Sequence, residues 1–143
     1  GMAIRFPEEK VRAMGRTAYG VKGINLTKGD YCIGMVVVKR DSTLLVVTEN
    51  GYGKRTSIDD YRVTNRGGKG VINVKASERN GEVVTIKEVL DQDELILITK
   101  KGIANRQPVK DIKVIGRATQ GVRLISLKSG DKVIDVARVV KES

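Results

Sequence analysis

Hydrophobic residues in this chain occur in short runs, rich in valine and isoleucine, that are separated by glycine, asparagine and aspartate. The main runs cover residues 33–38, 44–48, 83–90, 95–99 and 133–140. Apolar and polar positions also alternate over residues 71–74 and 124–127. Such runs predict strands rather than helices, because β-branched side chains suit a pleated sheet and no helical period is present. The pattern predicts an all-β fold.

The sequence repeats with a period of 50 and then 51 residues. A glycine opens each repeat, two arginines follow it at fixed distances, and a Gly-Val pair comes after them. The opening glycines are Gly1, Gly51 and Gly102. The chain is therefore interpreted as one domain, residues 1–143, with repeats at approximately 1–50, 51–101 and 102–143.

Four short strands in about 50 residues are typical of one propeller blade. A β-trefoil is the alternative, since three repeats would complete one, although a trefoil lobe is usually shorter. The run at 44–48 recurs at 95–99 but has no counterpart before the first repeat or after the third. The chain is therefore expected to begin and end inside repeats, which favours about three four-stranded blades of a longer propeller-like array.

The chain is strongly basic, with 27 Lys and Arg against 17 Asp and Glu and a net charge of +10. A charge this high favours polyanionic partners, above all nucleic acid. Only 3% of the residues are aromatic. Platforms that stack single-stranded bases depend on aromatic rings, so we expect a duplex that is recognised through its phosphates.

The residue types exclude most catalytic chemistry. The chain has no histidine, which removes Ser-His-Asp and Cys-His catalysis and histidine zinc sites. Its lone Cys32 cannot form an internal disulfide, which favours a reducing cytoplasm. The carboxylate pairs Glu8-Glu9 and Asp59-Asp60 are sequence neighbours, which point in different directions on extended backbone. No apolar run is long enough for a membrane helix and no signal-peptide pattern opens the chain. We expect a non-catalytic domain without cofactor, metal or membrane.

Positive charge is concentrated in the same part of every repeat. Residues 1–22, 51–75 and 100–123 carry 18 of the 27 basic residues but only 5 of the 17 acidic ones. Equivalent parts of a radial array lie on one rim, so these cations should form an arc. Such an arc suits a bent duplex whose phosphates are neutralised at intervals.

The candidate phosphate contacts are the arginines at fixed repeat positions and the basic residues near them. They are Arg5, Arg16, Lys22, Lys54, Arg55, Arg62, Arg66, Lys69, Arg106 and Arg117. Arg55 and Arg106 are weaker candidates, because an arginine inside a strand can form a salt bridge within its blade. Arg66, Gly67, Gly68, Lys69 and Gly70 form a box-like turn, in which glycines let the backbone approach an anion and present N–H donors.

Several stretches resemble the C-terminal domain of DNA gyrase A. They read IRFPEEKVRAMGR, GVKGINL, TENGYGKRT, YRVTNRGGKGV and IGRATQGVRLI, and they span nearly the whole chain. The resemblance implies the C-terminal half of a six-bladed β-pinwheel, with about three blades in this chain. The family's gyrase A box reads Gln-Arg-Arg-Gly-Gly-Lys-Gly, and residues 64–70 match five of its seven positions. The true box is therefore expected outside this chain.

The resemblance also implies a function. The domain would wrap duplex DNA around a basic perimeter and support negative supercoiling, with the rest of gyrase A and with gyrase B as partners. The catalytic tyrosine, ATP and magnesium would belong to other parts of the enzyme, which works at the nucleoid in the cytoplasm. Two alternatives are the corresponding domain of topoisomerase IV, and a propeller or trefoil that binds protein or glycan. Open blade edges further predict self-association.

Overall fold

The computed structural model describes residues 1–39, 41–75 and 77–140. Its regular structure consists of strands and three short 3-10 helices, which confirms the predicted all-β fold. The strands are β1 (Met2–Ala3), β2 (Thr43–Thr48), β3 (Tyr52–Ser57), β4 (Val71–Ile72), β5 (Val83–Val89), β6 (Glu94–Thr99), β7 (Ala104–Pro108), β8 (Val122–Arg123) and β9 (Val133–Val139). The 3-10 helices are η1 (Glu8–Lys10), η2 (Ile58–Asp60) and η3 (Val109–Asp111).

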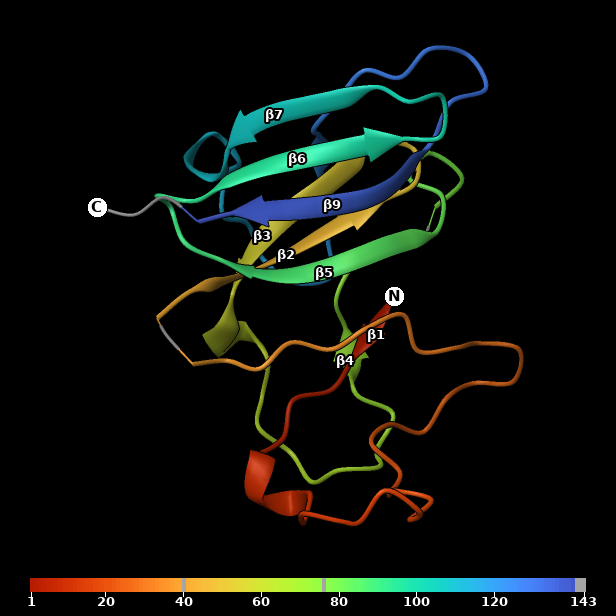
Figure 1. The fold of residues 1–143 in the computed structure, drawn as a ribbon, viewed down its shortest axis with the longest axis vertical. Helices are drawn as coiled ribbons and strands as arrows, with labels where there is room; N and C mark the ends of the chain where they lie inside the picture. Colours follow the sequence, from red (N-terminus) through yellow and green to blue (C-terminus); the bar gives the residue numbers. More distant parts are fainter. Residues whose placement is uncertain (40, 76, 141–143) are drawn as a thin grey trace.

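Within the described residues, the strands form three antiparallel sheets. The largest has the order β5-β2-β3-β8, the second has the order β7-β6-β9, and the third pairs β1 with β4. Figure 1 shows the two larger sheets gathered at one end of the molecule and the loops of the N-terminal repeat at the other. The runs at 44–48, 83–90, 95–99 and 133–140 are confirmed as strands, with ends that differ by one residue.

The short strands β4 and β8 each pair with a strand of the repeat before their own. In the largest sheet, Tyr52 pairs with Arg123 and Gly53 with Val122. The pairing of β1 with β4 is the same contact one repeat earlier. Successive repeats are therefore interlocked, because a strand of one repeat completes the sheet of the repeat before it.

The sheets are out of phase with the repeat boundaries expected from the sequence. The hairpin β2–β3 crosses the boundary between residues 50 and 51, and the hairpin β6–β7 crosses the one between 101 and 102. The sequence period is preserved, but a hairpin is held together by its own ladder of hydrogen bonds and ignores where the sequence repeat was opened.

The strand predicted over residues 33–38 is not formed. Its repeat equivalents β5 and β9 pair with β2 and β6, respectively. Within the described residues, no such central strand lies beside 33–38, and an isolated segment has no ladder to join. The sequence prediction was wrong here because a strand depends on its partner as well as on its own residues.

The alternating segment 124–127 is also not a strand, since regular pairing ends at Arg123. Its apolar side chains nevertheless pack inward, with Leu124, Ile125 and Leu127 lying against the main hydrophobic core. The alternation therefore predicted correctly that these side chains are buried against the core, although the segment does not pair as a strand.

The main core lies between the two larger sheets. It contains Leu45, Val47, Val89, Leu95, Leu97, Val109, Ile112, Val133 and Val136. Residues 44–48 of β2 are all buried, because β2 is the strand with partners on both sides and sheet faces covered. This explains why residues 44–47 are continuously apolar rather than alternating.

Candidate nucleic-acid interface

The basic part of each repeat is built in the same way. A strand leads into a 3-10 helix and a loop follows; in the second and third repeats a short strand, β4 or β8, then pairs back onto the preceding repeat. The 3-10 helices are only one turn long, so their last carbonyl groups have no partner inside the helix. Positively charged side chains in these loops can therefore bind either the exposed carbonyl groups or an external anion.

Arg66 brackets two carbonyl groups of the preceding repeat. Its Nε donates to the Lys10 carbonyl oxygen at 3.2 Å, and its Nη1 donates to the Lys22 carbonyl oxygen at 2.7 Å. Lys10 is the last residue of η1. The guanidinium of Arg66 thus caps the end of that helix and ties it to the loop that follows.

Arg117 makes the same contacts one repeat later. Its Nε donates to the Asp60 carbonyl oxygen at 3.1 Å, and its Nη1 donates to the Ile72 carbonyl oxygen at 2.7 Å. Asp60 and Ile72 are the repeat equivalents of the two residues whose carbonyl groups accept from Arg66. The second arginine of the repeat is therefore a structural bracket that reaches backward.

The first arginine of the repeat reaches forward. Arg5 Nη1 donates to the carbonyl oxygens of Ile58 and Tyr61 at 3.1 and 3.2 Å. Arg55 Nε donates to the carbonyl oxygen of Ile112 at 2.7 Å, and Ile112 is the repeat equivalent of Tyr61. Each junction between repeats is thus bonded from both sides. We call Arg5, Arg55, Arg66 and Arg117 the clasp arginines.

Backbone hydrogen bonds reinforce the same junctions. The Gly67 N–H donates to the Gly23 carbonyl oxygen at 2.8 Å, and the equivalent Ala118 N–H donates to Asn73 at 3.0 Å. We expected the box-like turn to present its amides to an anion, but the Gly67 amide is already bonded within the protein. Gly70 has a positive φ of 81°, and a Cβ there would lie 2.2 Å from the Ala3 carbonyl oxygen. Gly70 therefore serves close packing between repeats.

Lys54 is fully buried and lies at the junction of the second and third repeats. Its Nζ donates to the carbonyl oxygens of Asn73 and Gly116 at 2.6 and 2.9 Å, and to Thr119 Oγ1 at 3.0 Å. Burial, with the Arg117 cation nearby, lowers the pKa of Lys54 to about 8. Lys54 is therefore an interior ligand of backbone oxygens.

Two of the candidate phosphate contacts are corrected by their positions. Lys54 has no exposed surface, and Arg55 is only 4% exposed and forms a 2.6 Å ion pair with Asp91. Neither can reach a phosphate outside the molecule. The salt bridge expected for Arg55 is confirmed, as is that of Arg106, which pairs with Glu94 across the β6–β7 hairpin.

The remaining candidates lie at the surface. Arg16, Lys22, Arg62 and Lys69 have exposed side chains. Within the described residues, these four side chains form no hydrogen bond or ion pair with the protein. They are available to an external anion, in contrast to Arg5, Arg66 and Arg117, whose guanidinium groups are already bonded to carbonyl oxygens.

The structure also shows a cluster of two arginines around a tyrosine that was not predicted from the sequence. The Arg79 guanidinium lies 4.3 Å from the Tyr52 ring centre and Arg123 lies 5.7 Å from it. Arg123 also donates to the Tyr52 hydroxyl, which lowers the pKa of that tyrosine. Counted from the opening glycine, Arg79 has no basic counterpart in the other repeats, whereas Arg123 stands at the repeat position of Lys22 and Ile72, so a cation recurs there in two of the three copies.

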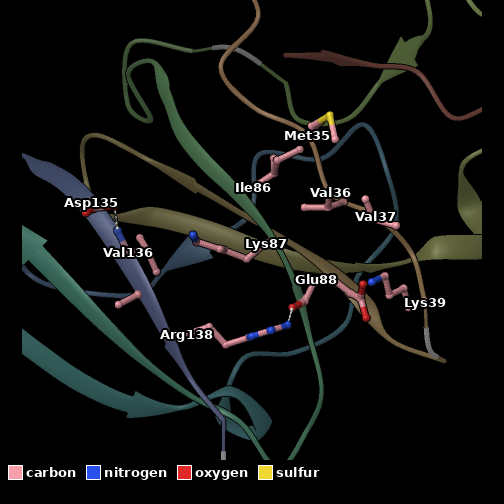
Figure 2. A pocket seen from close by; sticks show the side chains of 11 residues that line it. Met35, Val36, Val37, Lys39, Ile86, Lys87, Glu88, Asp135, Val136 and Arg138 are labelled. Carbon is pink, nitrogen blue, oxygen red and sulfur yellow. Dashed lines mark hydrogen bonds between the residues drawn. The ribbon is translucent and has the colours of Figure 1, made fainter. Parts of the chain in front are cut away.

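A hollow of about 840 Å³ lies where residues 35–39, β5 and β9 converge. Figure 2 shows apolar side chains of residues 35–37 on one side, and Lys87, Glu88 and Arg138 on the other. Arg138 Nη1 donates to the Glu88 carbonyl oxygen at 2.6 Å and so links β9 to β5.

In the described part of the chain, no cluster of acidic and cysteine side chains could hold a metal ion. Among residues 1–39, 41–75 and 77–140, no helix is long and apolar enough to cross a membrane.

A protein-family model described as DNA gyrase C-terminal domain, beta-propeller, matches residues 1–39, 42–89 and 93–139. The chain belongs to this family. The second and third matched segments each begin just before a hairpin and end with β5 or β9, so the family's units follow the sheets seen here. The propeller prediction is confirmed, and the β-trefoil alternative is set aside.

Curated relatives and solved structures agree with this family. The DNA gyrase A protein of Staphylococcus aureus strain MRSA252 is 50% identical over 142 residues, which cover 98% of this chain and 16% of that relative. A DNA gyrase A C-terminal domain superposes with a TM-score of 0.90 at 30% identity, covering 98% of this chain and 48% of that one. The C-terminal domain of a DNA topoisomerase IV gives 0.87 at 28% identity, covering 97% and 44%.

Proposed function

We propose that the chain is a non-catalytic domain of a DNA gyrase A protein that binds duplex DNA and wraps it. The observation that carries this proposal is a set of exposed, unpaired cations that recurs in the basic segments of a DNA gyrase C-terminal domain family member. Identity of 50% to a gyrase A protein over 98% of the chain supports gyrase over topoisomerase IV.

The proposed binding is electrostatic. Lysine and arginine side chains neutralise phosphates and release condensed counterions, which stabilises the complex most at low salt. Phosphate contacts fix the path of the duplex but read no base edges. Sequence preference should therefore be limited to how easily the DNA bends.

Within the enzyme, the wrapped DNA would support negative supercoiling in a complex with the rest of gyrase A and with gyrase B. Strand cleavage, ATP and magnesium would belong to those other parts. The proposed place of work is the nucleoid in the cytoplasm. This chain alone should bind DNA without turning over any substrate.

Ligation of a nicked plasmid in the presence of the chain tests for wrapping. DNA that is wrapped when the nick closes keeps a changed linking number after the protein is removed. We expect the change to grow with chain concentration until binding saturates. An unchanged linking number at saturation would overturn wrapping.

A second assay separates gyrase from topoisomerase IV. The full-length protein that carries this chain is assembled with its ATPase partner and given relaxed plasmid and ATP. Negative supercoiling supports gyrase, whereas relaxation without supercoiling supports topoisomerase IV.

A further inference from the structure

Three positions in the basic part of the repeat hold a cation in all three copies. The first two positions are those of the arginines at residues 5, 55 and 106 and at residues 16, 66 and 117, and they include the clasp arginines. The third position lies between them and holds Arg12, Arg62 and Lys113. Of this third set, only Arg62 was a candidate from the sequence, because the replacement of arginine by lysine at 113 hides the recurrence.

The local backbone turns the third position outward. Each residue follows the end of a 3-10 helix by two places. The residue between has extended backbone, with φ −102° and ψ 110° at Tyr61 and φ −92° and ψ 116° at Ile112. Tyr61 and Ile112 are buried, and successive side chains on extended backbone point in opposite directions. Arg62 and Lys113 are therefore directed to solvent.

The clasp arginines hold this stretch of backbone in place. Tyr61, just before Arg62, gives its carbonyl oxygen to Arg5, and Val63, just after it, forms a bridge with Arg5. The third repeat shows the same arrangement, since Ile112 accepts from Arg55 and Val114 forms a bridge with Arg55. In the second and third repeats the third cation is thus presented from a backbone that is fixed on both sides.

Nothing in the described part of the protein neutralises these three cations. Arg12, Arg62 and Lys113 are exposed and form no hydrogen bond or ion pair among residues 1–39, 41–75 and 77–140. Acidic residues stand in the preceding 3-10 helices, such as Asp60 and Asp111, yet no ion pair joins them to these cations. The repeat retains a cation here that has no use within the fold.

We propose that Arg12, Arg62 and Lys113 form a contact row that binds the phosphates of a duplex backbone, one contact from each repeat. The clasp arginines, in contrast, hold the repeats together and only position that row. This inference rests on the proposed DNA-binding function and divides its cations into two roles. A regularly repeated side chain on a fixed backbone suits a polymer with regularly spaced charges.

The test compares duplex binding by two variants with equal loss of charge. The row variant carries Arg12→Gln, Arg62→Gln and Lys113→Gln. The control variant carries Lys28→Gln, Lys100→Gln and Lys128→Gln, which change three exposed lysines outside the row. Fluorescence anisotropy with a labelled duplex gives the slope of log K against log salt for each variant and for the unmodified chain.

The row variant should lose about 0.9 in slope per phosphate contact, or about 3 in total, and the control should lose less than about 1. Equal losses in the two variants, or an unchanged slope in the row variant, would overturn the contact row while leaving DNA binding intact. Absence of duplex binding by the unmodified chain would instead overturn the proposed function, and the contact row with it.

A third variant separates positioning from contact. Arg66→Lys with Arg117→Lys keeps both charges but loses the paired donors that bracket two carbonyl groups. This variant should keep the salt slope of the unmodified chain and show a lower Tm. An unchanged Tm would mean that these arginines do not hold the repeats together, and would overturn the division of roles.

Discussion

At the scale of single residues, the arginines of the repeat are defined by what their donors reach. Arg66 and Arg117 stand in successive repeats, and each bonds the same pair of carbonyl groups in the repeat before its own. A carbonyl group at the end of a short helix is costly to leave unpaired. The fixed spacing of these arginines is therefore explained by the junctions between repeats.

Arg117→Lys should lower the free energy of unfolding by about 1–2 kcal/mol, since a single ammonium group cannot bond both acceptors as the guanidinium does. Chemical denaturation followed by circular dichroism measures the change. Arg16→Lys is the matched control, because Arg16 has the same repeat position but no partner in the described part of the chain. Similar losses in the two variants would contradict the bracket.

Lys54 is a second residue whose role depends on its partners. Lys54→Met keeps the length of the side chain but leaves the oxygens of Asn73, Gly116 and Thr119 without their donor. We expect a loss of about 2–4 kcal/mol in the free energy of unfolding at neutral pH. If the variant is as stable as the unmodified chain, the free energy lost by burying the Lys54 charge equals the free energy gained from its hydrogen bonds.

Lys54 also predicts a dependence on pH. Its pKa is about 8 in the folded chain against an ordinary value of 10.5, so the unfolded chain holds the extra proton between these values. Its contribution to the free energy of unfolding therefore rises as the pH rises from about 8 to about 10.5. The stability advantage of the unmodified chain over Lys54→Met should widen across this range. A constant difference would contradict the lowered pKa.

Residue chemistry could be anticipated from the sequence only in part. The spacing of Arg5, Arg55 and Arg106 marked a position of importance, and salt bridges within a blade were expected at the last two. The burial of Lys54 was not foreseeable, because a lone lysine becomes an interior residue only where tertiary structure brings three oxygens to it. The sequence shows the spacing at which a basic residue recurs, but it does not show which acceptor groups its side chain will bond.

At the scale of elements, Gly70 and Gly121, which stand directly before β4 and β8, let these strands approach the preceding repeat. A Cβ at Gly121 would lie 2.6 Å from the Gly53 carbonyl oxygen, and its φ is +82°. Gly121→Ala should therefore cost about 2 kcal/mol or more, from the backbone conformation together with the clash. Gly116→Ala is the control, since nothing lies within 4 Å of a Cβ there. Equal effects of the two substitutions in thermal unfolding would contradict this account.

Element prediction succeeded where a segment carries its partner close by in the chain. Residues 83–90 and 133–140 pair with hairpins that the chain supplies, and both were expected as strands. Residues 33–38 have a similar composition but no such partner in the described residues. The exchange of edge strands between repeats could not be predicted either, because one residue pattern fits a strand in its own sheet or in its neighbour's.

At the scale of the whole molecule, the first repeat has a segment with exposed apolar side chains that is not paired with any strand in the described residues. Ile33, Met35 and Val37 are exposed, Met35 by 80%, in a stretch whose equivalents are paired strands. We expect the chain to self-associate through this segment, as unpaired strand-forming segments tend to do. Light scattering should show a mass that rises with concentration, and Val37→Lys should reduce the rise. A monomer at every concentration would contradict this expectation.

Charge is the other property of the whole molecule. The positive charge is carried by exposed cations, by clasp arginines already bonded to carbonyl groups, and by the buried Lys54 and Arg55, so the net charge of +10 overstates what an external anion can meet. The contact row repeats once per structural unit along interlocked sheets. A bound duplex would therefore be held at regular intervals by a scaffold whose junctions are themselves stabilised by arginine.

The most direct test of this account is equilibrium binding of a labelled duplex to the unmodified chain between about 50 and 200 mM salt. Three phosphate contacts predict a slope of log K against log salt of about −3 or steeper. No binding at the lowest salt, or an affinity that does not change with salt, would contradict the central claim that this chain binds duplex DNA through its repeated cations.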